Sequence, residues 1–169
     1  MLACHFYRIS LLSLVLFMLT IDSVNAEQLD DFSSDGCSQF PDGTLGQQDL
    51  WCDCCITHDI AYWQGGTQAQ KQQADIELRA CVLHKTESSL LASTMYYGVT
   101  WGGSPIFPVW YRWGYGWQYG RGFLSLSADE KALVEVKLQQ YYLTLPGSSC
   151  DFEHPIKKMI RKEVQTLLR

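Results

Sequence analysis

The densest group of side chains capable of chemistry lies in residues 51–62, which read WCDCCITHDIAY. Of the three histidines after residue 26, only His58 lies among cysteines with a carboxylate, Asp59, directly beside it. If the run is helical, residues three or four apart share a face, so the cysteines before His58 and Tyr62 after it lie about one turn away. An imidazole with carboxylates nearby can act as a general base.

Two predicted helices, one on each side of a glycine pair, are expected to position the residues of this run. Residues 49–64 are compatible with a helix that ends at Gly65-Gly66. Thr67 and Gln70 form a capping box that begins a second helix running to about Lys85. A glycine stop followed at once by a new cap predicts a tight pair of antiparallel helices.

The spacing from the turn brings a second carboxylate, Asp75, to His58. His58 lies about 10 Å before the glycines and Asp75 about 14 Å after them at the α-helical rise per residue. Antiparallel helices would therefore place Asp75 beside the imidazole, where it would fix the ring tautomer and stabilise the protonated ring. Asp59 would remain free to bind a hard cation together with carbonyl oxygens of the preceding loop.

The other segments are expected to be a loop, a shorter helix, an aromatic segment and two C-terminal helices. The sequence pattern predicts a loop over residues 27–48 and a short third helix over residues 88–97. Residues 96–123 are rich in aromatic residues and glycine, which indicates a packed loop or short hairpin, with an interfacial anchor as the alternative. A capping box predicts a helix over 127–143, and an amphipathic helix is expected from Pro155.

Composition and the first residues indicate a single exported domain. The 169-residue chain has 47% apolar residues and a formal charge of −5, which excludes a disordered chain and disfavours nucleic-acid binding. Residues 1–26 contain Arg8, an apolar stretch over 11–21 and a final Ala26, the layout of a cleaved signal peptide. That stretch is shorter than the roughly 20 residues of a membrane span. We therefore expect residues 27–169 to be secreted or periplasmic, with no transmembrane span.

The cysteine count agrees with an oxidising compartment. After removal of the signal segment, which takes Cys4 with it, six cysteines remain: Cys37, Cys52, Cys54, Cys55, Cys81 and Cys150. An even number in an exported chain predicts three disulfides, although spacing alone leaves their pairing open. A zinc site using the cysteines and His58 is the alternative.

These residues together resemble a known family. The secreted phospholipase A2 family is similar in its doubled cysteine, its His-Asp pair and its following tyrosine, here Cys54-Cys55-x-x-His58-Asp59-x-x-Tyr62. The resemblance extends over about residues 35–83, with a Gly36-Cys37 loop before the motif and Ala74-Asp75 and Cys81 after it. It implies a mainly α, disulfide-stapled fold with two antiparallel core helices and a preceding calcium loop.

The resemblance also implies a role for each matching residue. His58 would activate a water, Asp75 would orient the histidine, and Tyr62 would hydrogen-bond Asp75. Calcium would be held by Asp59 and by loop oxygens. The family's loop is glycine-rich after its cysteine, whereas this chain reads CSQFPDG over 37–43. The ligands expected from the loop are the carbonyls of Gly36, Ser38 and Phe40, with the side chain of Asp42 as a further candidate.

Family disulfides would join Cys37 to Cys55 and Cys54 to Cys81. A further family disulfide has alanine at both of its positions here, Ala61 and Ala74, so no cysteine is orphaned. The two cysteines that remain, Cys52 and Cys150, are then expected to pair.

The function that we expect is an exported, calcium-dependent phospholipase A2 that hydrolyses the sn-2 acyl ester of glycerophospholipids. Its substrate would be presented by a phospholipid membrane surface or by micelles. The alternative is a noncatalytic lipid- or protein-binding module on the same scaffold, in which the aromatic segment and the basic face of the C-terminal helix make the contacts.

Overall fold

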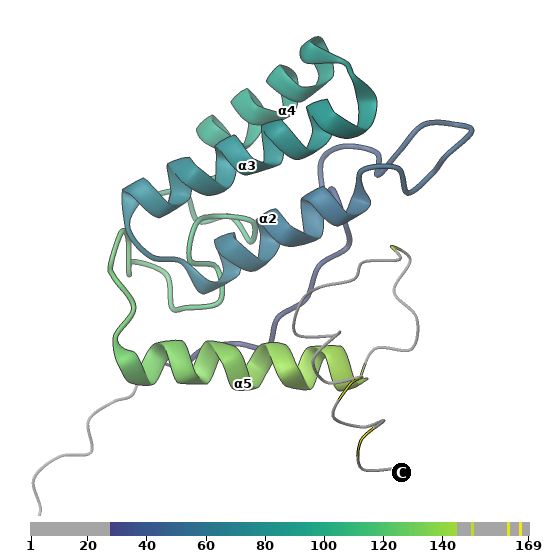
Figure 1. Cartoon of the computed structure of the whole chain (residues 1–169). Helices are drawn as coiled ribbons and strands as arrows, with labels where there is room; N and C mark the ends of the chain where they lie inside the picture. Colours follow the sequence, from purple (N-terminus) through teal and green to yellow (C-terminus); the bar gives the residue numbers. More distant parts are fainter. Residues whose placement is uncertain (1–27, 145–149, 151–161, 163–165, 167–169) are drawn as a thin grey trace, which may run out of the picture.

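The computed structural model describes residues 28–144 together with 150, 162 and 166 (Figure 1). The expected signal peptide (1–26) and most of the helix expected from Pro155 lie outside the described residues. In the described part the protein is mainly helical and has no strand. The four helices of the described residues are α2 (Cys52–Gln64), α3 (Gln68–Thr86), α4 (Ser89–Gly102) and α5 (Ala128–Thr144).

The predicted antiparallel pair is α2 and α3, which lie side by side and run in opposite directions (Figure 1). Both residues of the connecting glycine pair have positive φ, +67° at Gly65 and +133° at Gly66, which residues with a side chain rarely adopt. The Thr67 and Gln70 capping box is present in full. Helix α2 begins at Cys52 rather than at residue 49, because the residues before it form hydrogen-bonded turns.

Helix α4 packs against α3 and is longer than the sequence indicated. It begins at the Ser88 cap, as predicted, but continues to Gly102, so residues 96–102 of the aromatic segment are helical and the expectation of a loop or hairpin there was wrong. Gly98 inside a helix costs about 1 kcal/mol relative to alanine. Burial of Ala92 and Met95 on the same helix stabilises it by packing, which propensity does not include.

Residues 103–123 form turns without a strand, so this part of the segment is the packed loop that was one of the two predictions. Its tryptophans anchor it: the indole N–H of Trp113 donates to the carbonyl of Gly66, and that of Trp117 to the carbonyl of Gln64. The buried guanidinium of Arg112 donates to carbonyls within the same loop. The loop is therefore fixed against the turn between α2 and α3.

Helix α5 covers the face of α2 that points away from α3 (Figure 1). The capping box at its start is present: Ser127 Oγ accepts from the Glu130 backbone, and the Glu130 carboxylate accepts from Ser127. A core cluster joins the two helices to the N-terminal segment: Leu29, Phe32, Cys52, Ile56, Ile60, Trp63, Trp117, Val134, Leu138 and Cys150. This arrangement leaves the other face of α2, with His58 and Tyr62, for α3.

Three disulfides hold the helices and loops together. The structure joins Cys37 to Cys55, Cys54 to Cys81 and Cys52 to Cys150, with Cα–Cα separations of 5.1, 5.7 and 5.7 Å respectively. These are the expected pairs. Since each thiolate that zinc would need is in a disulfide, the alternative of a cysteine zinc site has no support. No helix in the described ranges is both long and apolar enough to cross a membrane.

Candidate active site

The contact that the helix spacing predicted is present between His58 on α2 and Asp75 on α3. The Nε2 atom of His58 lies 3.1 Å from Oδ1 of Asp75, and both side chains are buried. A carboxylate only accepts hydrogen bonds when ionised, so Nε2 carries the proton of the neutral ring. The other ring nitrogen, Nδ1, is then left with its lone pair as a proton acceptor.

Asp75 receives hydrogen bonds from three other side chains. The Tyr62 hydroxyl donates to Oδ1 at 2.7 Å, as the family resemblance implied. The Lys71 ammonium lies 2.8 Å from Oδ2, and the hydroxyl of Thr100 on α4 lies 3.2 Å from the same oxygen. Every acceptor direction of this buried carboxylate is thus directed toward a donor, which fixes its position beside His58.

These contacts set the charges of the pair. Burial raises the pKa of Asp75, but hydrogen bonds from His58, Lys71 and Tyr62 and the charge of Lys71 outweigh it and hold that pKa below its ordinary value. Burial lowers the pKa of His58 more than Asp75 raises it, and the charge of Lys71 lowers it further. Asp75 is therefore ionised and His58 neutral at neutral pH, the states that a general base and its orienting carboxylate require.

Sequence reasoning missed Lys71 and Thr100. Lys71 precedes Asp75 by four residues on α3, a spacing at which side chains meet on one helix face. That signal was available, but lysine is rarely buried, and in this protein only 6% of Lys71 is exposed. Thr100 comes from α4, whose position relative to α3 the sequence did not reveal.

Loss of the Lys71 charge is expected to destabilise the protein. We expect Lys71→Met to lower the free energy of unfolding at pH 7 by about 3 kcal/mol, because it leaves a buried carboxylate without its cation. The control is Lys137→Met, which removes the partner of the exposed Asp31 carboxylate and should cost less than about 1 kcal/mol. Urea unfolding followed by circular dichroism measures both.

The same experiment has a predicted pH dependence. Since the pKa of Asp75 is lower in the folded protein than in the unfolded chain, its contribution to stability is present above about pH 4 and is lost as the pH falls through the folded pKa. The deficit of Lys71→Met should therefore shrink in acid. A deficit that stays constant down to about pH 3, below the unfolded pKa, would contradict the assigned ion pair.

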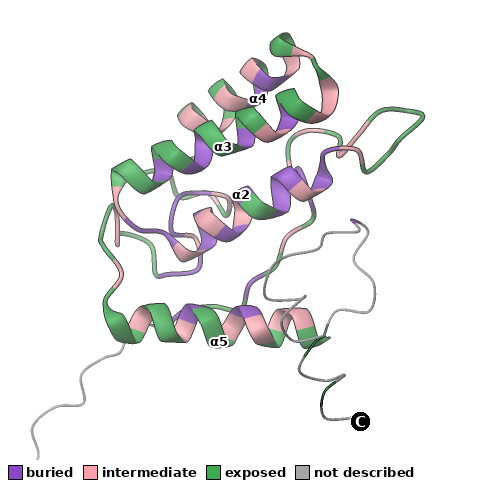
Figure 2. Cartoon of the chain, viewed as in Figure 1, coloured by how far each residue is buried: buried purple, intermediate pink, exposed green. Residues whose placement is uncertain are grey.

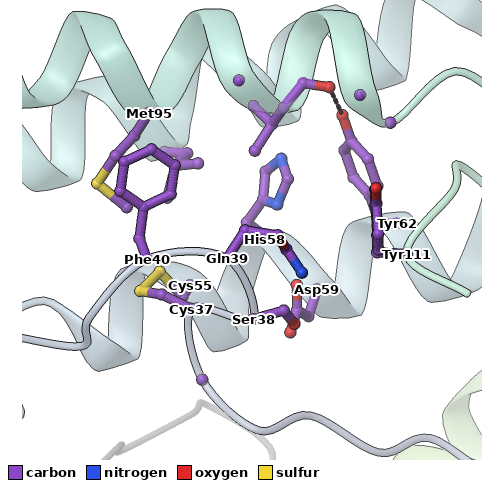
Figure 3. Close-up of a pocket in the computed structure, with 16 residues that line it drawn as sticks. Cys37, Ser38, Gln39, Phe40, Cys55, His58, Asp59, Tyr62, Met95 and Tyr111 are labelled. Atoms are coloured by element: carbon purple, nitrogen blue, oxygen red, sulfur yellow. Dashed lines mark hydrogen bonds between the residues drawn. A yellow bond between two sulfur atoms is a disulfide. The ribbon is translucent and has the colours of Figure 1, made fainter.

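A cavity opens beside His58 and brings Asp59 into the same space (Figure 3). Its walls come from the loop before α2, from α2 and α3, and from α4 and the loop after it. Apart from His58 and Asp59 the lining is largely apolar, with Phe40, Leu78, Met95 and Val99 among its residues. Asp59 follows His58 directly in the sequence, so the two side chains leave the helix in different directions. Both nevertheless line the same cavity.

The surroundings of Asp59 suit a divalent cation. Ser34 Oγ donates to its Oδ2 at 2.6 Å. Burial and the negative charges of Asp35 and Asp42 raise the pKa of Asp59 to about 7, although the hydrogen bond from Ser34 opposes this rise. Carboxylate and main-chain oxygens are the ligands that calcium prefers, and a cation would relieve the crowding of negative charge. The residues present therefore fit this ion.

The structure separates the expected loop ligands into two kinds. Gly36, Ser38 and Phe40 line the cavity together with Asp59. Asp42 does not, because its Oδ1 atom accepts the backbone N–H of Cys37 at 2.6 Å and shapes the loop instead. Gly36 has φ +87°, and a Cβ there would lie 2.3 Å from the Asp42 carboxylate, so the loop requires glycine at this position.

Comparisons with known proteins identified no relative: no family model, no curated protein and no solved structure matches this chain. What the site does must therefore be argued from its own chemistry. A neutral imidazole, oriented by a buried carboxylate and facing a cavity, can remove a proton from water. A second carboxylate in that cavity can hold a cation that stabilises negative charge on a reacting oxygen.

Proposed function

We propose that the protein is an exported, calcium-dependent phospholipase A2 that hydrolyses the sn-2 acyl ester of glycerophospholipids. The observation that carries the proposal is the 3.1 Å contact of His58 with Asp75 at a cavity that also contains Asp59. The motif resemblance supports the same activity, and the disulfides support export to an oxidising compartment, secreted or periplasmic. In this proposal His58 and Asp75 are catalytic and Tyr62 is a positioning residue.

In the proposed mechanism His58 moves the proton. Its Nδ1 atom takes a proton from the water that attacks the ester carbonyl, while Nε2–H stays hydrogen-bonded to Asp75. The ionised Asp75 stabilises the imidazolium that results, and Tyr62 and Lys71 keep that carboxylate in place. The imidazolium then returns the proton to the leaving glycerol oxygen as the ester bond breaks.

Asp59 and the loop supply the second half of the site. Asp59 with the main-chain oxygens of Gly36, Ser38 and Phe40 would hold calcium. When bound, the ion supplies positive charge for the carbonyl oxygen and the phosphate of the substrate. The apolar walls at Leu78 and Met95 would receive the acyl chain next to the ester. A cavity of about 170 Å³ holds only part of such a chain, so the rest of the lipid remains outside.

The test is an assay of products from a phosphatidylcholine with different acyl chains at sn-1 and sn-2. We expect mass spectrometry to find the sn-2 fatty acid and the matching lysolipid with calcium, and neither with excess chelator. Release of the sn-1 chain, or equal release in chelator, would contradict the proposal. Absence of products with several headgroups, from folded protein with calcium, would favour the noncatalytic binding module.

A further inference from the structure

A second cavity adjoins the one that contains His58. Its volume is about 500 Å³, and its walls come from residues 30–38, from α2 and from the loop after α4. The two cavities share Ser38, Asp59 and Tyr111, which are labelled in Figure 3. The proposed mechanism uses only the smaller cavity, so the chemistry of the larger one is still without a role.

Carboxylates make up most of the charged lining of the second cavity. Four line it: Asp30, Asp31, Asp35 and Asp59. None of the described residues of its lining is a lysine, arginine or histidine. Lys137 pairs with Asp31, but no cationic side chain in the described part of the chain pairs with Asp35 or Asp59. A cavity lined by charges of one sign attracts the opposite sign, so a positively charged ligand is favoured.

Aromatic rings form the rest of the wall. The rings of Trp110 and Tyr111 meet edge to face, with centroids 5.3 Å apart and planes at 87°, so they form two walls at nearly a right angle. Tyr115 contributes a third ring, and its hydroxyl donates to the carbonyl of Ser33 at 3.1 Å. The faces of tryptophan and tyrosine rings attract cations, most strongly where the cation is partly removed from water.

Backbone contacts and core packing hold these walls in place. The N–H of Asp30 donates to the carbonyl of Gly116 at 2.8 Å, and the indole N–H of Trp63 donates to the carbonyl of Asp30 at 2.9 Å. In the same segment Leu29 and Phe32 are buried in the core, while the neighbouring aspartates are exposed (Figure 2). The cavity is therefore largely preformed, as sites for small ligands usually are.

The combination of rings and carboxylates distinguishes one kind of cation from others. A divalent metal ion takes a close shell of oxygen ligands and has no use for ring faces or for so large a space. A primary ammonium group needs an acceptor for each of its N–H groups. A quaternary ammonium group has no N–H donor and a diffuse charge, and aromatic rings are its usual binding surface in proteins.

We propose that the second cavity binds a quaternary ammonium group of the choline type. Two sources carry this group: a free choline compound and the headgroup of phosphatidylcholine. The lipid source rests on the proposed function, in which the substrate phosphate lies at the cation held by Asp59. Since Asp59 lines both cavities and two methylene groups join the phosphate ester to the ammonium of choline, the headgroup would enter the second cavity while the acyl chain occupies the first.

The first test is binding of choline to the unmodified protein, without calcium or lipid, in a titration followed by NMR at low ionic strength. The control ligand is 3,3-dimethylbutanol, which has the shape of choline but no charge. We expect choline to bind about fivefold more tightly or better, because both the rings and the carboxylates respond to its charge. This arm does not depend on the proposed activity.

Matched variants locate the bound choline. Trp110→Leu removes one ring and Asp35→Asn one charge, and each should weaken choline binding about fivefold. The asparagine can still accept the hydroxyl of Ser38, which donates to Asp35 at 2.7 Å. The controls are Trp101→Leu and Asp49→Asn, the same changes at exposed residues that line neither cavity, and both should bind choline as the unmodified protein does.

The second test asks whether the ammonium group arrives as a lipid headgroup. Phosphatidylcholine and phosphatidylglycerol are supplied in the same mixed micelle with calcium, so that contact with the lipid surface is common to both. We expect kcat/KM to be about fivefold higher for phosphatidylcholine. Trp110→Leu should bring this ratio toward one, whereas Trp101→Leu should leave it unchanged.

The outcomes separate this inference from the proposed function. Choline that binds no more tightly than 3,3-dimethylbutanol, or that Trp110→Leu and Trp101→Leu weaken equally, would overturn the quaternary ammonium site even if lipid is hydrolysed. Choline binding at this cavity without a headgroup preference would assign it to a free choline compound. Choline binding in a protein that hydrolyses no phospholipid would reject the phospholipase proposal and support the site.

Discussion

Replacement of His58 by glutamine is expected to lower the turnover of phospholipid hydrolysis by about 10³-fold or more, because it removes the general base. Glutamine can still donate an amide hydrogen to Asp75, in the place of the 3.1 Å contact that Nε2 makes. It has no basic nitrogen to accept a proton from water. The buried carboxylate therefore keeps a donor, and the fold should survive while the chemistry is lost.

The measurement is product release from the His58→Gln variant beside that from the unmodified protein. Together with a check of folding, it separates loss of catalysis from loss of structure. The matched control is His84→Gln, the same change at an exposed histidine on α3, which should leave turnover unchanged. Circular dichroism and thermal unfolding check that both variants are folded. Turnover in His58→Gln within about tenfold of the unmodified protein would reject His58 as the base, since general-base catalysis contributes more than that.

The pH profile of the unmodified protein gives an independent check. Only neutral His58 can accept a proton, so in saturating calcium, where Asp59 stays ionised, kcat/KM falls when the pH drops through the pKa of His58. Because burial holds that pKa below its ordinary value of about 6.5, the acid limb should lie below about pH 6.5. An acid limb well above this value would mean that a group other than His58 controls the rate.

The part of the site that the sequence could predict depends on contacts between neighbours in one helical hairpin. The capping box at Thr67 and the two glycines before it fix where α3 begins, so the helical rise alone places Asp75 opposite His58. The same local signals predicted the cap at Ser127. Such predictions succeed because side-chain caps and positive φ angles are decided within a few residues.

The rest of the site depends on contacts between elements far apart in the chain. Thr100 reaches Asp75 only because α4 packs on α3, and the length of α4 was underestimated since packing outweighed the cost of Gly98. Asp42 was considered as a metal ligand, yet its side chain binds a backbone N–H of its own loop. Hydrophobic pattern and propensity do not contain this information.

Substitution of Asp59 by asparagine is expected to have opposite effects on the metal-free and the calcium-bound protein. In the absence of metal, burial and the nearby Asp35 and Asp42 disfavour the ionised carboxylate and raise its pKa to about 7. Since this pKa is raised above the unfolded value, stability is lost as the pH rises from about 4 toward 7 and above. An asparagine side chain carries no charge and can still accept the Ser34 hydroxyl. Asp59→Asn should therefore raise the metal-free melting temperature at about pH 8, where the native carboxylate is ionised.

The gain in stability should come with loss of the calcium response. At the proposed site in the unmodified protein, calcium would have to displace a proton from Asp59, so calorimetric affinity should fall as the pH drops through about 7. Asp59→Asn should abolish the calcium-induced rise in melting temperature and lower hydrolysis to the level seen with chelator. Asp49→Asn, at an exposed loop position, is the matched control and should change neither quantity. In this proposal the destabilisation of the metal-free protein and the binding of calcium arise from the same desolvated carboxylate. An Asp59→Asn variant that is stabilised without metal but still binds calcium would therefore place the cation elsewhere.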